Sequence, residues 1–312
     1  MAHNATESSQ THFPGNLLKN VTFKKSFRSQ LVPYSFLMPS LLILAVFGFI
    51  PFVQGIYLAF TRYPLLQEPE FIGLANFERL TRDPIFLESL KNTFIYMLVT
   101  VPIRLIIGLM LALALNKAFP GRTLLRAIFY FPVVTPLIIA ASLWLFLFNT
   151  HFGMINAVLE EFGLSSVSWL TSSSTAFLSV MIMSIWKTVG WNMVILLAGL
   201  QGIPNEIYEA AAVDGSNRWR TFWHITLPLL KPTILVSVVI STINASQVFE
   251  QVYVMTGGGP GYSTMTLVQL VYNTAFQQFD MGYASAISSV LFVIIMVITF
   301  INFKFFNEEV VY

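Results

Sequence analysis

SQLVPYSFLMPSLLILAVFGFIPFVQGIYLAFT, residues 29–61, contains no Asp, Glu, Lys or Arg. Four more charge-free runs follow it, at residues 127–150, 162–186, 232–249 and 281–303. A helix of about 20 apolar residues crosses the hydrocarbon core of a bilayer. Because lipid offers no hydrogen bonds, the backbone of such a segment must satisfy its own polar groups. The runs therefore predict a helical protein that crosses a membrane several times.

The composition supports a membrane protein and excludes several other classes. Of 312 residues, 55% are hydrophobic and 10% are charged, whereas a soluble domain carries about 25% charged residues. The mean hydropathy is +0.70. A formal net charge of +2 gives no argument for nucleic-acid binding. The chain has no cysteine, and its four histidines are scattered, so we expect no disulfide and no metal site.

Six spans are expected in an all-α fold. The apolar segments lie at about 34–60, 92–116, 124–149, 176–200, 232–254 and 283–305. The expected organisation is an N-terminal tail over residues 1–33, a six-helix domain over 34–305 and a C-terminal tail over 306–312.

The distribution of Lys and Arg predicts the orientation, because cytoplasmic loops carry an excess of both. One side of the membrane would hold both tails and the loops after the second and fourth spans, with Lys19, Lys24, Lys25, Arg28, Lys117, Arg122, Arg126, Arg218, Arg220, Lys231 and Lys304. The other side would hold Arg62, Arg79, Arg82 and Lys91. We therefore expect cytoplasmic termini and a cytoplasmic loop over residues 201–231.

That cytoplasmic loop should contain two short helices. The first is expected over residues 206–213, and Gly215 can stop it by taking a positive φ angle. Ser216 can cap a second helix that runs to about His224. Pro228 is expected to end the second helix before the fifth span.

The first of these helices contains EAAAVDG, residues 209–215. Three consecutive alanines occur in many helices, so one interpretation is an amphipathic helix at the membrane surface. The other is a docking site, since small residues let a helix enter a groove closely. Glu209 could then fix the orientation through a charged hydrogen bond.

The spacing of this segment resembles the cytoplasmic coupling loop of the membrane subunits of bacterial ABC importers. Its pattern is Glu-Ala-Ala, three residues, Gly, nine residues and Ile-x-Leu-Pro, which here ends at Ile225, Leu227 and Pro228. The resemblance implies that the loop docks a separate ATPase. The residues implied in coupling are Glu209, Ala210, Ala211, Asp214, Gly215, Leu227 and Pro228.

Three further strings resemble the carbohydrate-importing permeases of the maltose/glycerol-phosphate type. They are MTGGGP at 255–260, FIGLANF at 71–77 and AGLQGIP at 198–204. A flexible turn is the alternative for the glycines. A phosphate-binding loop is excluded, because no Lys-Ser/Thr follows them. Trp186, Lys187, Gly190 and Asn192 also look like that family.

This resemblance extends from about residue 34 to 305 and implies a type I ABC importer permease fold. The implied function is to move a sugar or sugar-like solute from an extracytoplasmic binding protein into the cytoplasm by alternating access. The implied partners are a second homologous permease chain, two copies of an ABC ATPase and the binding protein, in a bacterial cytoplasmic membrane. No catalytic residue and no directly bound cofactor is expected, since ATP and Mg would bind to the ATPase.

Polar residues inside the spans suggest where the solute passes. A charge at the bilayer centre is costly unless it is paired or hydrated, and Arg104 and Lys187 lie in spans two and four. They would either be neutralised within the bundle or line a water-filled path. Side chains of span five, at helical spacing on one face, would either hold the bundle or bind sugar hydroxyls. The candidate path residues are Trp186, Lys187, Asn192, Asn244, Gln247, Gln251 and Tyr253.

Two other classes of function remain open on the residues alone. A secondary transporter would need an ion-coupling carboxylate deep in the membrane, for which Glu250 is the candidate. A membrane-embedded enzyme would need a convergent acid, base and nucleophile, and no such set is visible. The sequence does not name the solute: disaccharides, oligosaccharides, polyols, glycosylated compatible solutes and glycerol phosphates all fit.

Overall fold

The structure, a computed structural model, describes residues 27–306. It is mostly helical with almost no strand, and it has five helices long and apolar enough to cross a membrane, or six if one bent pair counts as a span. The expected all-α membrane fold is therefore confirmed. Most of the two tails expected at 1–33 and 306–312 lies outside the described residues. The described residues divide into two compact units, residues 27–53 and residues 54–306.

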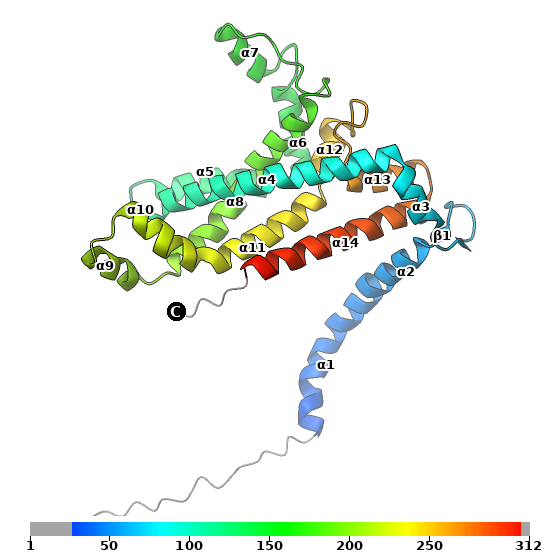
Figure 1. The fold of residues 1–312 in the computed structure, drawn as a ribbon, viewed down its shortest axis with the longest axis horizontal. Helices are drawn as coiled ribbons and strands as arrows, with labels where there is room; N and C mark the ends of the chain where they lie inside the picture. The colour runs from blue at the N-terminus through cyan, green and yellow to red at the C-terminus, as the bar shows by residue number, and fades with distance from the viewer. Residues whose placement is uncertain (1–26, 307–312) are drawn as a thin grey trace, which may run out of the picture. The chain divides into compact units, whose positions relative to one another are not determined.

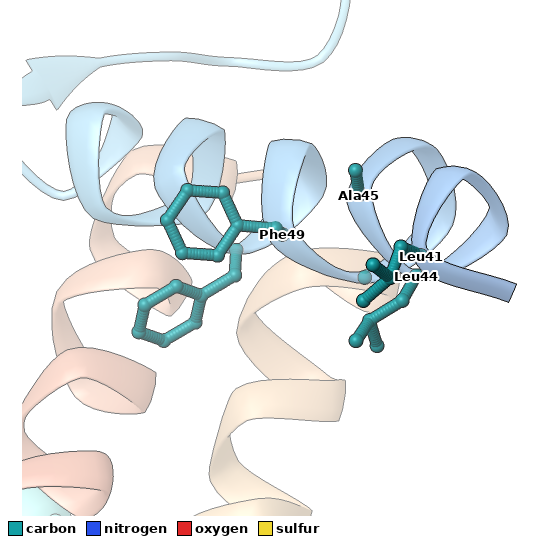
Figure 2. Close-up of a pocket in the computed structure, with 6 residues that line it drawn as sticks. Leu41, Leu44, Ala45 and Phe49 are labelled. Atoms are coloured by element: carbon teal, nitrogen blue, oxygen red, sulfur yellow. The ribbon is translucent and has the colours of Figure 1, made fainter. Parts of the chain in front are cut away.

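The first unit contains most of the first span. Helix α1 (Phe27–Leu44) continues through a π-helical turn, η1 (Ala45–Phe49), into α2 (Ile50–Leu58). The helix already includes Phe27, the first described residue, and so extends beyond the start expected at residue 34. An apolar pocket of about 570 Å³ lies on it (Figure 2), and its lining residues are Leu41, Leu44, Ala45, Gly48, Phe49 and Phe52. An apolar helix surface of this kind suits lipid or another helix.

Four long helices make up the body of the second unit. They are α4 (Pro84–Asn116), α8 (Ala176–Gln201), α11 (Leu227–Ser246) and α14 (Met281–Phe306), which lie alongside one another (Figure 1). Buried apolar side chains from these helices form clusters along the bundle. The helices approach closely where glycine faces a neighbour. A Cβ on Gly108 would lie 2.8 Å from the Cβ of Asn192, and one on Gly190 would collide with the carbonyl oxygen of Phe129.

We expect Gly190→Val to prevent stable folding. The added side chain would meet backbone of α5 (Arg122–Val134), which cannot move aside as a flexible side chain can. Overpacking a core costs about 1–3 kcal/mol or more. Gly55→Val is the control, since a Cβ there meets nothing within 4 Å. The measurement is thermal unfolding and monodispersity in detergent; equal melting temperatures for the two variants would contradict the close approach.

The third span is broken, so the single helix expected over 124–149 is wrong. Helices α5 and α6 (Leu137–Leu147) meet at an angle of 98°. Pro136 follows Thr135, whose ψ of 133° is extended. A residue before proline avoids helical geometry, and proline itself has no N–H to continue the helix. Helices α6 and α7 (Met154–Glu161) project sideways from the bundle as a result (Figure 1).

The fifth span begins earlier than expected. Helix α10 (Arg218–Thr221), the π-helical turn η2 (Phe222–Thr226) and α11 form one helix from Arg218 to Ser246. The expected ending before Pro228 is wrong. The Leu227 N–H bonds to the Phe222 carbonyl across the wider turn, and Pro228 then falls in the first turn of α11. Inside this continuous helix Pro228 has no N–H to bond to the carbonyl four residues earlier, and the wider π-helical turn just before it lets the helix continue past the proline.

The fifth span also ends earlier than the expected residue 254. Phe249 departs from helical geometry at φ −140° and ψ −66°, and a separate short helix, α12 (Glu250–Met255), follows. The hydroxyl of Thr266 donates to the Val248 carbonyl at 2.9 Å, which satisfies a backbone group freed by the break. Irregular backbone at membrane depth requires this kind of internal satisfaction.

Short elements close the end of the bundle opposite α9 and α10 (Figure 1). Strands β1 (Thr61–Arg62) and β2 (Glu70–Phe71) pair antiparallel, and helix α3 (Ala75–Arg82) follows them. The Asn76 amide donates to the carbonyls of Ala59 and Thr61 at 3.0 and 2.8 Å. Asn76 thereby fixes the FIGLANF segment to the end of the first span.

The loop that follows the glycine-rich segment, at the same end of the bundle, is held by helix α4. The Asn92 amide donates to the carbonyls of Tyr262 and Met265 at 3.1 and 3.0 Å. Helix α13 (Leu267–Tyr272) begins just after this loop, and the turn η3 (Asn273–Gln277) follows it. Within the glycine-rich segment itself, the Gly259 carbonyl accepts from the Thr264 hydroxyl at 2.9 Å, and the Gly258 carbonyl accepts from the Thr264 N–H at 3.3 Å.

Candidate coupling surface and membrane-embedded polar centre

Helix α9 (Asn205–Val213) carries the EAAAVDG segment at the predicted cytoplasmic end. Gly215 follows it with a φ of +74°, as expected. The Gly215 N–H bonds to the Ala212 carbonyl, and the Ser216 N–H bonds to the Ala211 carbonyl. The next helix is capped by Asn217, whose side chain accepts from the Arg220 N–H at 2.8 Å. The cap expected at Ser216 is therefore one residue too early.

Helix α9 has two distinct faces. Its outward face consists of Glu206, Glu209, Ala210 and Val213, which share one side at helical spacing and are all exposed. Val213 is 88% exposed. The opposite side packs against the apolar cluster at the ends of α4, α8 and α11 through Ile207 and Tyr208, and Ala211 is buried there as well. The helix is thus anchored to the spans and presents a free surface of two carboxylates and small apolar groups.

The residues implied in coupling occupy three environments. Glu209, Ala210, Asp214 and Gly215 are exposed. Ala211 is buried on the inward face of α9. Leu227 and Pro228 are half-buried in the first turn of α11, so they belong to the span. Glu206 and Val213 complete the outward face, and the spacing of the motif did not single them out.

A hydrogen-bonded polar centre joins three helices of the bundle. The Tyr96 hydroxyl of α4 donates to the Ser184 Oγ of α8 at 2.6 Å. The Gln251 amide of α12 donates to both oxygens, at 3.0 and 3.1 Å. Tyr96 and Ser184 were missed in the sequence, because no local spacing signals a contact between residues this far apart. The amide of Gln251 is therefore used within the chain.

Hydroxyls and a carbonyl within the bundle satisfy the guanidinium of Arg104 by hydrogen bonds. It is 3% exposed, and its guanidinium donates to the carbonyl and hydroxyl of Thr100 and to the hydroxyl of Thr188, at 2.9–3.2 Å. Within the described residues, no carboxylate lies within 4.0 Å of it. Arg104 binds α4 to α8, and its contacts agree with the first of its two interpretations.

Lys187 and Asn192 also have partners inside the chain. The Lys187 ammonium donates to the Val133 carbonyl at 2.9 Å. Lys187 thereby caps the end of α5 at the break in span three, where the last carbonyls of a helix favour a cation. Asn192 Oδ1 accepts from Ser237 and Ser241 at 2.6 and 2.9 Å and joins α8 to α11.

Asn244 and Gln247 differ from these residues because their side chains are exposed. Neither has a hydrogen bond to another described residue, and Glu250, also exposed, has no ion pair there. The break at 247–249 separates Asn244 and Gln247 from Gln251, which turns inward to Tyr96. The single face expected from helical spacing is therefore not formed. Asn244, Gln247 and Glu250 together are called the polar strip below.

Aromatic rings flank the polar centre and the polar strip. Trp186 packs on Trp144 with centroids 5.6 Å apart, and the buried Trp144 Nε1 has no hydrogen-bond partner. Tyr253, which is exposed, stacks on Phe249 at 5.4 Å. Tyr272 contacts both rings, at 5.3 and 5.2 Å. Tyr272, which lies on the separate helix α13, thus completes an aromatic cluster with Phe249 and Tyr253.

Residues 104–308 match the family described as the binding-protein-dependent transport system inner membrane component. The chain belongs to this family. It is 37% identical to the trehalose/maltose transport system permease protein MalF of Thermococcus litoralis, over 91% of this chain and 97% of that protein. It is 38% identical to the sulfoquinovosyl glycerol transport system permease protein SmoG of Agrobacterium fabrum, over 88% and 89% of the two chains.

A solved structure agrees in fold. The chain superposes with a TM-score of 0.80 and 25% identity on a chain of a bacterial ABC transporter involved in the import of the acidic polysaccharide alginate. The match covers 90% of this chain and 96% of the other. The resemblance to ABC importer permeases and the type I fold are therefore confirmed. The family consists of inner membrane components of binding-protein-dependent transport systems, so the self-sufficient secondary transporter and the enzyme are set aside.

Proposed function

We propose that this chain is one membrane subunit of an ATP-driven importer for a sugar or sugar-like solute. Membership of a binding-protein-dependent permease family supports the role of the chain. Relatives whose names specify trehalose/maltose and sulfoquinovosyl glycerol support a glycoside as the solute. The outward face of α9 is the observation that carries the coupling mechanism.

Coupling would proceed through the two faces of α9. An ATPase bound to Glu206, Glu209 and Val213 would move helix α9 as a rigid body. Because Ile207 and Tyr208 pack on the ends of the spans, that movement passes to α4, α8 and α11. Alternating access then follows if the ATPase binds the inward-open and outward-open arrangements of the spans with different affinities. Two ATPase copies would bind ATP and Mg, and this chain would bind neither.

The polar strip supports a solute path along span five. Exposed amides and carboxylates inside a membrane are costly against lipid, so they face protein or a water-filled cavity. In this assembly that side would face a second permease chain, with the path between the two chains. Asn244 and Gln247 would hydrogen-bond solute hydroxyls, and Tyr253 would supply a ring surface. A binding protein would deliver the solute on the outer side of the cytoplasmic membrane.

A cross-linking experiment tests the docking face. The chain lacks cysteine, so Val213→Cys creates a unique reactive site on the outward face of α9. In native membranes we expect a short bifunctional reagent to join this site to an ATPase, identified by mass spectrometry. Phe162→Cys is the control, since it is 78% exposed and lies at the predicted outer end. Absence of an ATPase adduct at Val213→Cys, with the intact complex present, would contradict the proposal.

A further inference from the structure

A cavity of about 840 Å³ lies where the ends of spans two and five meet the coupling helix. Three elements contribute its lining: the last turn of α4, one flank of α9, and the start of the helix that runs from Arg218 to Ser246. The lining residues are Leu113, Ala114, Lys117, Tyr208, Ala212, Ser216, Arg218, Thr221, Phe222 and Thr226.

The cavity is cationic. Lys117 and Arg218 are exposed, and neither forms an ion pair with another described residue. No Asp or Glu is among the lining residues. Tyr208 lies in the same lining, and its hydroxyl can donate to an oxyanion. The hydroxyls of Ser216 and Thr221 are bonded to each other at 3.1 Å, and Thr221 donates to the Asn217 carbonyl at 3.0 Å, so they contribute polarity to the lining. These groups together suit a phosphate or another anionic group.

The polarity of the cavity changes with depth in the membrane. Leu113 lies in α4, one turn before Lys117 at the end of that helix. Phe222 lies one turn after Arg218, the first residue of the other helix. Both helices therefore place a cation at the cytoplasmic surface and an apolar side chain deeper. Trp219, 72% exposed, packs on Trp223 with centroids 5.7 Å apart. Tryptophan is enriched at membrane–water interfaces, which agrees with this depth.

We propose that this cavity binds an anionic phospholipid, with the phosphate between Lys117 and Arg218 and an acyl chain along Leu113 and Phe222. Basic pockets between spans on the cytoplasmic side are suited to lipid headgroups. An acidic segment of the ATPase would satisfy the cations, but it would leave the apolar lower part unfilled. A bound lipid would fix the flank of α9 at Tyr208 and Ala212 to α4. Lipid occupancy would thereby hold the coupling helix in place and raise ATP-coupled transport.

The experiment uses the whole purified importer in nanodiscs of phosphatidylcholine with increasing phosphatidylglycerol. Native mass spectrometry measures the phosphatidylglycerol retained, and ATPase activity measured with binding protein reports coupling. The test variant is Lys117→Gln with Arg218→Gln. Its matched control is Arg122→Gln with Arg220→Gln, which removes the same charge from the same membrane surface outside the lining.

We expect the test variant to retain phosphatidylglycerol about thirtyfold more weakly, from about 1 kcal/mol for each cation, and to lose stimulation by that lipid. The cations removed in the control lie outside the lining, so they attract the lipid only at a distance, where salt screens the interaction. The control should therefore retain phosphatidylglycerol, and be stimulated by it, within a few-fold of the wild type. Equal losses in both variants would overturn the proposal, since they would indicate attraction to the whole surface. Loss of the ATPase from the complex with lipid retention unchanged would also overturn it, in favour of a site for an acidic protein segment.

Discussion

Glu209→Lys should abolish transport while the chain remains folded in the membrane. Glu209 is exposed on the outward face of α9, with no hydrogen bond to another described residue, so its replacement removes no contact within the chain. A hydrogen bond to a charged group contributes about 1.5–3 kcal/mol, and the reversed charge adds repulsion. We expect the ATPase to dock tenfold to a hundredfold more weakly, or about 1.4 kcal/mol per factor of ten.

The measurement combines solute uptake in cells with the amount of ATPase recovered with the tagged chain. Glu161→Lys is the control, since Glu161 is exposed at the end of α7 on the predicted outer side. Uptake at the wild-type rate in Glu209→Lys would exclude docking through this face.

Gly215→Val tests the orientation of the same surface. A β-branched residue at a φ of +74° is strained by about 1–2 kcal/mol, so the bend after α9 should open and turn the docking face. Open space surrounds the position, so no clash adds to the strain. We expect transport to fall below about a tenth of the wild-type rate, a loss of about 1.4 kcal/mol.

Gly163→Val is a closely matched control for the bend. Gly163 has a φ of +73°, open space around it and the same two backbone hydrogen bonds that end its helix, but it lies in the outer loop. The two variants impose the same local strain at opposite ends of the protein. Equal effects on transport would indicate that strain alone, and not the position of α9, explains the loss at Gly215.

The sequence predicted the features that depend on local composition. Runs of apolar residues gave the spans, and the glycine at 215 gave the bend after α9, because only glycine takes a positive φ angle without cost. The breaks in spans three and five were not predicted. In span three, Pro132 and Pro136 are compatible with either a kinked helix or a broken one. Tertiary contacts, such as that of Lys187 with the Val133 carbonyl, decide between the two.

The residues of the candidate solute path could be predicted only in part from the sequence, for a related reason. Residue type identified Arg104, Lys187 and Asn192 as unusual inside a membrane, but it could not reveal their partners. The structure assigns each of them a contact within the chain. Asn244 and Gln247 lack such contacts in the described part of the chain. The distinction between a residue that holds the bundle and one that can bind solute therefore depends on which groups are already satisfied.

Asn244→Leu with Gln247→Met should raise the solute concentration needed for half-maximal uptake by about tenfold. Each amide would lose a hydrogen bond to the solute worth about 0.5–1.5 kcal/mol, with side-chain volume nearly unchanged. Both side chains are exposed, so stability should hold. ATPase activity stimulated by the empty binding protein should also be unchanged, because the coupling helix is untouched.

Ser288→Ala is the control for this last experiment. Ser288 is also an exposed polar residue within a span, but its hydroxyl donates to the Ala284 carbonyl of its own helix at 3.0 Å. Uptake by Ser288→Ala should match the wild type, since that hydroxyl is already used. If the double variant imports solute with unchanged concentration dependence, the polar strip contacts protein in the assembled importer. The solute path would then lie on another face of the bundle.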